Sequence, residues 1–174
     1  MTETNINREI LFEQIEKATN ELIRVFSSFS QDSINKVPFE GSWTAAQVAE
    51  HMRQSYGVVE TVNGSVEETK RDPLQNDKVL KDAFLNFEVK MKSPDFILPE
   101  KKQYEKKQLV SSLTKLIGEI KHAVQTLDLT ATCLDFKLPN LGALTRAEWL
   151  FFAVYHTKRH THQLKKIYDK VENN

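Results

Sequence analysis

The sequence predicts an all-α protein, built as a four-helix bundle. Five glycines and five prolines in 174 residues are too few for the frequent turns that a sandwich or barrel of short strands needs. Apolar residues also recur three and four positions apart through several long segments, which is the spacing of amphipathic helices. Such helices bury their apolar stripes against one another, and four of them make a bundle.

Two long helices are expected in the N-terminal half. Residues 8–29 carry apolar side chains at helical spacing, which indicates an amphipathic helix. Residues 44–70 begin with Thr-Ala-Ala-Gln, which has the form of a capping box and therefore marks a helix start. Glycine weakens a helix interior, so we expect a kink or break in this second helix at Gly57 or Gly64.

The C-terminal half predicts two more long helices and one shorter helix. The shorter helix is expected at residues 77–89, and two prolines in residues 93–99 exclude helix from the segment that follows. Residues 104–127 again show an apolar stripe at helical spacing. Residues 145–171 open with a second capping box, Thr-Arg-Ala-Glu, and should form the last helix.

Composition favours one globular domain over residues 1–174, because 40% of the residues are hydrophobic and 28% are charged. Lys plus Arg equals Asp plus Glu, at 24 each, so no net field attracts nucleic acid or a membrane surface. No segment has the ~18 apolar residues of a membrane span, and the first residues do not resemble a signal peptide. We therefore expect a cytoplasmic protein, in which the lone Cys133 is a small apolar filler.

His156 and His160 are four residues apart, which places them on adjacent turns of one helix face at a Cβ separation of ~5–6 Å. At about 100° per residue, this face also carries most of the apolar side chains of the last helix. These side chains are Trp149, Phe152, Ala153, Leu164, Ile167 and Val171. The histidine pair should therefore point into the bundle.

His51 occupies the corresponding position in the second helix, because small and apolar residues share its face. The other two histidines fall among charged residues: His122 lies opposite the apolar stripe of its helix, and His162 lies well away from the stripe of the last helix. Both are expected at the surface, so neither is a predicted ligand.

Three inward imidazoles predict a site for one divalent transition-metal ion. Buried histidines repel one another when protonated and need partners when neutral, and an ion removes both problems. Zn²⁺ and Ni²⁺ are the leading candidates, ahead of Fe²⁺ and Mn²⁺, and three nitrogens leave a position for water or substrate. The pair lacks the glutamate of an HExxH motif, so a metalloprotease mechanism is not expected. The alternative is three ordinary buried histidines.

Several of these residues together resemble the DinB-like superfamily, which includes bacillithiol S-transferases. The matching positions are Trp43, Ala49-Glu50-His51-Met52, Leu144-Thr145, Trp149 and His156-x3-His160-x2-Gln163-Leu164. The resemblance implies a bundle with a long crossover connection, frequently a homodimer, with His51, His156 and His160 as metal ligands. In this resemblance Gln163 matches a recurrent glutamine. It is either a residue that hydrogen-bonds to a ligand histidine or merely a polar residue near the helix surface.

The resemblance fixes a site more firmly than a reaction, and three functions stay open. The first is a metal-dependent transferase in which the ion activates a low-molecular-weight thiol for attack on an electrophile. The second is a metal-dependent hydrolase with an activated water. The third is a non-catalytic metal- or ligand-binding bundle. Because Glu50 and Glu148 flank the histidine stripe instead of lying on it, no general base is evident, and a small-molecule thiol is the preferred substrate.

Overall fold

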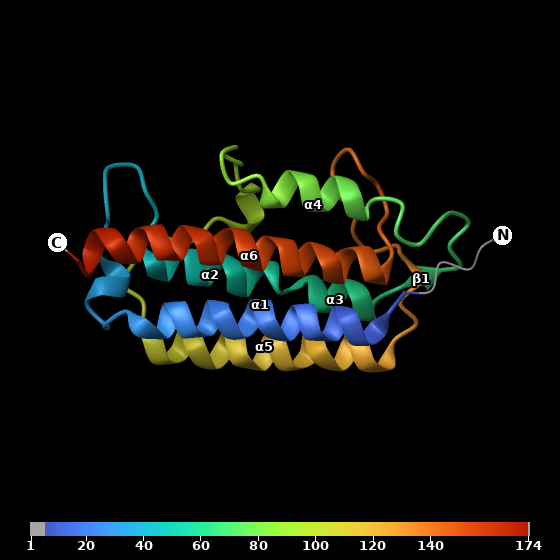
Figure 1. The fold of residues 1–174 in the computed structure, drawn as a ribbon, viewed down its shortest axis with the longest axis horizontal. Helices are drawn as coiled ribbons and strands as arrows, with labels where there is room; N and C mark the ends of the chain where they lie inside the picture. The colour runs from blue at the N-terminus through green and yellow to red at the C-terminus, as the bar shows by residue number, and fades with distance from the viewer. Residues whose placement is uncertain (1–5, 174) are drawn as a thin grey trace.

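The computed structural model describes residues 6–173 and confirms a mostly helical four-helix bundle with a long crossover (Figure 1). Its four columns are α1 (Arg8–Ser28), α2 (Ala45–Ser55) continued by α3 (Val58–Asn63), α5 (Lys106–Thr126) and α6 (Arg146–Val171). A single 3-10 turn, η1 (Ser33–Asn35), lies between α1 and α2. Within the described residues, no helix combines the length and apolar character of a bilayer span.

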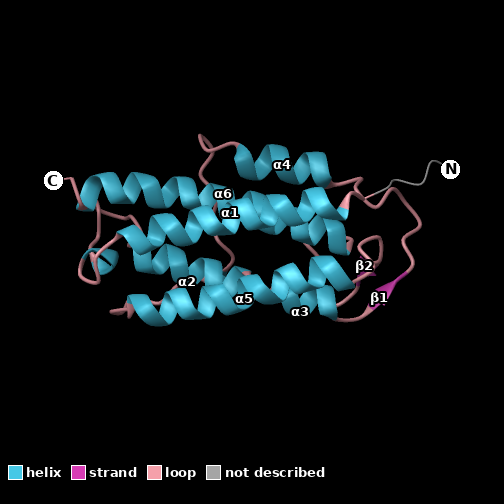
Figure 2. Cartoon of the chain, turned by 60° about the horizontal axis from the view of Figure 1, so that its bottom comes forward, coloured by secondary structure: helices cyan, strands magenta, loops and turns pink. Residues whose placement is uncertain are grey.

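The crossover is residues 64–105, and it exists because α3 and α5 run in the same direction (Figure 1). The chain must therefore return along the whole bundle between them. On this route it forms α4 (Asp77–Leu85), which packs against the outer side of α6, and the 3-10 turn η2 (Asp95–Ile97). Figure 2 shows the short antiparallel pair of β1 (Val66–Glu67) and β2 (Thr132–Cys133) at one end of the bundle.

The second helix is shorter than the sequence predicts, and its end has a tertiary cause. The break at Gly57 was expected, but helix ends at Asn63 and not near residue 70. Asp135 accepts a hydrogen bond from the Ser65 N–H at 2.9 Å, and a Cβ on Gly64 would lie 2.0 Å from that carboxylate. The glycine thus permits a close approach that turns the chain into β1.

Both predicted capping boxes are present. Thr44 and Gln47 exchange the two bonds of the box that opens α2, and Thr145 and Glu148 exchange those that open α6. Each box satisfies backbone N–H groups that a helix start leaves without partners. The two helices that carry the candidate ligands are therefore fixed at their first turns.

Glu148 also connects the crossover to α6. Its carboxylate is fully buried and accepts two hydrogen bonds from the Arg71 guanidinium, at 2.7 and 2.9 Å. It accepts a further bond from the Asn76 N–H at 2.7 Å. A buried carboxylate with these partners is well compensated, whereas removal of one partner leaves the other charge unpaired.

We expect Glu148→Ala to lower the free energy of unfolding by about 3 kcal/mol, because it leaves the Arg71 charge without its partner and removes one of the two bonds of the α6 capping box. Urea unfolding followed by circular dichroism measures the change. Asp82→Ala is the control, since its ion pair with Lys78 is exposed and should contribute at most about 1 kcal/mol. Equal losses in the two variants would contradict this assignment.

Candidate metal centre

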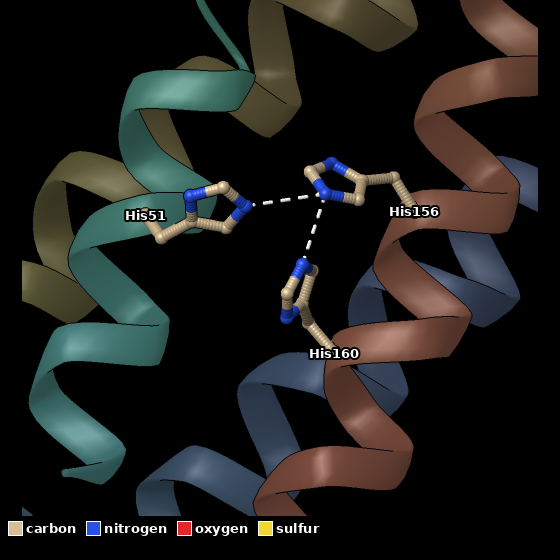
Figure 3. A group of neighbouring side chains, drawn as sticks. All are labelled: His51, His156 and His160. Carbon is tan, nitrogen blue, oxygen red and sulfur yellow. Dashed lines mark hydrogen bonds between the residues drawn. The ribbon is translucent and has the colours of Figure 1, made fainter. Parts of the chain in front are cut away.

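Three histidines meet at the centre of the bundle, as the sequence predicts (Figure 3). His51 extends from α2, and His156 and His160 extend from adjacent turns of α6. Their exposed fractions are 2%, 6% and 8%. Nearby, the Tyr56 hydroxyl lies 2.7 Å from the Thr157 hydroxyl and joins the end of α2 to the middle of α6. This contact therefore fixes which faces of α2 and α6 meet beside the histidines.

The Nε2 atoms of the three rings converge. His156 Nε2 lies 3.2 Å from His51 Nε2 and 2.9 Å from His160 Nε2. One ligand nitrogen from each ring lies within 4.8 Å of the others. Tetrahedral coordination at ~2.0–2.1 Å separates two ligand nitrogens by about 3.3 Å. The observed spacing fits one transition-metal ion between the three rings.

Hydrogen bonds at Nδ1 determine which ring nitrogens have free lone pairs. His51 Nδ1 lies 3.0 Å from the backbone oxygen of Ile97, which only accepts, so this nitrogen carries the proton. His160 Nδ1 faces the amide oxygen of Gln163 at 2.8 Å and donates to it. Both Nε2 atoms are therefore left with lone pairs in the neutral rings.

This tautomer pattern leaves the centre short of protons. His156 Nε2 can donate to one neighbour at most, so in at least one of its two short contacts the neighbour's lone pair faces a ring nitrogen without a hydrogen bond. A cation placed between the nitrogens removes that repulsion. The arrangement is thus better suited to holding a metal ion than to a network of ordinary histidines.

The surroundings keep the imidazoles neutral, which is the form that binds metals. Burial lowers the pKa of His51, and the hydrogen bond to Ile97 only partly opposes this. Burial, and secondly the neighbouring His160, lower the pKa of His156 well below its usual value. Burial and the nearby His51 lower the pKa of His160 to about 3.

No carboxylate belongs to this group of ligand atoms in the described part of the chain. Glu50 pairs with Arg53 at 2.7 Å, and Glu148 is held by Arg71 at the start of α6. The donor set is therefore three nitrogens without protein charge. This donor set suits zinc, nickel or iron better than magnesium or calcium, which prefer oxygen ligands.

The remaining histidines lie outside the group, and one of them differs from its prediction. His122 is exposed on α5, as expected. His162 was expected at the surface but is half-buried, because Phe87 of the crossover stacks on its ring at 4.3 Å and 12°. Helical position alone could not show that the crossover covers this side of α6. Cys133 is buried as predicted, and burial raises its pKa to about 11, so its thiol is not reactive.

The crossover supplies features of the centre that sequence reasoning missed. Besides the Ile97 carbonyl, it brings the Ser93 hydroxyl to 3.4 Å from His51 Nδ1. Arg159 of α6 holds the segment down by donating to the backbone oxygens of Phe84, Asn86 and Val89. The Gln47 side-chain amide of α2 donates to the backbone oxygen of Glu100. Backbone oxygens have no residue-type signature, so no pattern in the sequence could have identified these contacts.

Comparison with known proteins agrees with this architecture. A solved structure, YfiT from Bacillus subtilis, is similar with a TM-score of 0.61 and 14% sequence identity, over 99% of this chain and 93% of that one. It is described as a probable metal-dependent hydrolase with an unusual four-helix bundle topology. At this identity the likeness shows a shared fold. Among curated protein sequences, none matches the chain.

The family comparison gives the broader assignment. The profile of the DinB superfamily matches residues 14–164, which include α2 and the part of α6 that carries His156 and His160. The match confirms the resemblance that the two histidine segments indicate. The chain belongs to the DinB superfamily.

Proposed function

We propose that His51, His156 and His160 bind one divalent transition-metal ion, with zinc or nickel preferred, and that the protein transfers a low-molecular-weight thiol to a small electrophile. The observation that carries the proposal is the convergence of the three Nε2 atoms with at most one proton among them. Three nitrogen ligands leave at least one coordination position for a substrate.

Thiol transfer is preferred over hydrolysis because, within the described residues, no carboxylate oxygen joins the three ligand nitrogens as a general base. When bound, the ion acts as a Lewis acid that lowers the pKa of a coordinated thiol. A thiol needs a much smaller reduction than water, since their ordinary pKa values are about 8.5 and 15.7. In the reaction, a carbon–sulfur bond forms, the leaving group departs with its electron pair, and the thiol proton goes to solvent.

Hydrolysis is the second candidate, and the specific observation in its favour is the similarity to YfiT. The same three nitrogens would hold the ion in either reaction. A hydrolase of this kind needs a group that accepts the proton of the attacking water. The nearest acidic side chains by sequence, Glu50 and Glu148, are instead engaged by arginines. The homodimer remains a prediction from the family.

We expect protein purified without a chelating tag to contain about one equivalent of metal, and His156→Ala or His160→Ala to lose it while helicity survives. Each substitution removes one of three ligands, and two imidazoles hold the ion much more weakly. Elemental analysis measures the content, and His162→Ala, outside the ligand group, is the matched control. Wild-type protein that takes up no ion on incubation with zinc, nickel or iron would refute the centre.

Gln163→Leu should weaken metal binding by about 10–100-fold, because the substitution removes the acceptor that holds His160 in its tautomer. Competition with a chelating dye measures the affinity. Since Gln163 is only half-buried, the fold should tolerate the change, and thermal unfolding checks this. An unchanged affinity would mean that Gln163 is merely a polar residue near the surface.

Metal-loaded protein should consume monochlorobimane at a rate that depends on added low-molecular-weight thiol, and His156→Ala should reduce this rate to that of the reaction without protein. The fluorescence of the product measures transfer. A parallel panel of activated esters without thiol tests the alternative. Metal-dependent ester cleavage together with no thiol-dependent reaction would replace transfer by hydrolysis.

A further inference from the structure

A chain of ring contacts lies beside the histidine centre. Phe152 stacks on His156 with ring centroids 5.2 Å apart. Trp149 meets Phe152 at 5.6 Å and Phe136 at 5.7 Å. Phe136 in turn meets Phe96 at 5.8 Å. We call Phe96, Phe136, Trp149 and Phe152 the aromatic circuit.

The circuit returns to the histidines through the backbone. Phe96 precedes Ile97, whose oxygen accepts the His51 Nδ1 proton, and the His51 and His156 rings are 5.0 Å apart. Phe152, at the inner end of the circuit, therefore lies next to a histidine of the centre. Phe96 and Phe136, at the outer end, face solvent, because they are 68% and 37% exposed.

The two outer rings of the circuit belong to connections, not to bundle helices. Phe96 lies in η2 of the crossover, and Phe136 lies in the connection between β2 and α6. Each exposes apolar surface to water, at a cost that burial against a ligand would remove. Connections of this kind adjust more easily than packed helices. The outer rings thus offer apolar surface that a flat molecule would cover.

Trp149 contributes an unsatisfied polar group within the circuit. Its side chain is 3% exposed, and its Nε1 has no hydrogen-bond acceptor among the described residues. A buried indole N–H ordinarily finds an acceptor, because leaving the donor unpaired is unfavourable. Ligand pockets are typically apolar with one or two polar groups that fix orientation. The unpaired N–H of an indole that contacts two phenyl rings meets this description.

We propose that the aromatic circuit binds the electrophilic substrate, and that this substrate is a flat apolar molecule whose oxygen accepts a hydrogen bond from Trp149 Nε1. The assignment rests on the proposed thiol transfer and adds the class of the acceptor. Stacking against Phe136 and Phe152 supplies affinity, and the Trp149 N–H selects molecules that carry a carbonyl or similar oxygen. A molecule that stacks on Phe152 lies near the ring of His156, which Phe152 contacts.

Binding of a matched, unreactive ligand pair to zinc-incubated protein tests the site. The probes are 2-acetylnaphthalene, which has the acceptor oxygen, and 2-ethylnaphthalene, which keeps the naphthalene ring and the two-carbon chain but lacks the oxygen. Equilibrium dialysis measures Kd with no thiol present. We expect Trp149→Phe to raise the Kd of the acetyl compound by about 5-fold and to leave the Kd of the ethyl compound nearly unchanged. Phe136→Leu should raise both Kd values.

Phe39→Leu is the control, because Phe39 is 58% exposed in the connection before α2 and lies outside the circuit. It should change neither Kd. The proposal is overturned if neither probe binds, or if Trp149→Phe and Phe136→Leu bind both probes as tightly as the wild type. Thermal unfolding identifies any variant that fails to fold, and Phe136→Leu, at a half-exposed position, keeps the test decisive.

Binding and transfer can fail separately. If the probes bind as expected but metal-loaded protein shows no thiol-dependent consumption of monochlorobimane, the aromatic site stands and thiol transfer is wrong. If transfer occurs and the probes do not bind, thiol transfer stands and the aromatic site is wrong.

Discussion

The hydrogen bond from His51 to the Ile97 backbone oxygen is the interaction on which the site depends, because it links the crossover to the ligand set. By placing the proton on Nδ1, it leaves the Nε2 lone pair directed at His156. Ile97 also follows Phe96 in the chain, so the same bond holds the segment that carries Phe96. One backbone acceptor thus determines the tautomer of a candidate ligand and attaches the crossover to it.

The bundle topology explains why a backbone acceptor is available there. Since α3 and α5 are parallel, residues 64–105 must pass along the bundle, and they cross the level of the histidines. Two arginines attach this route to α6. Arg71 of the crossover binds Glu148 in the first turn of α6, and Arg159, which precedes His160 in α6, binds the Asn86 backbone oxygen of the crossover. The segment that the topology requires therefore also contacts the histidine centre.

The sequence was sufficient for the bundle and for the inward placement of the three histidines, because helical periodicity reports which side chains point inward. It was insufficient wherever a distant segment determined the outcome. Helix ended at Asn63 because Asp135 approaches Gly64, and His162 is half-buried because Phe87 covers it. The hydrogen bond that His160 donates to Gln163 was one of two alternatives that the sequence left open, since a spacing of three residues permits the contact without requiring it.

Charge connects the ligand set to the choice of substrate. Three neutral imidazoles offset none of the charge of a divalent ion, and the aromatic rings around His156 lower the local dielectric response. An anionic partner at the open position is therefore favoured, and a thiol becomes anionic with less assistance than water. A carboxylate ligand would weaken this preference by neutralising part of the charge. The absence of acidic groups from the ligand set, within the described residues, thus favours the thiol reaction on electrostatic grounds as well.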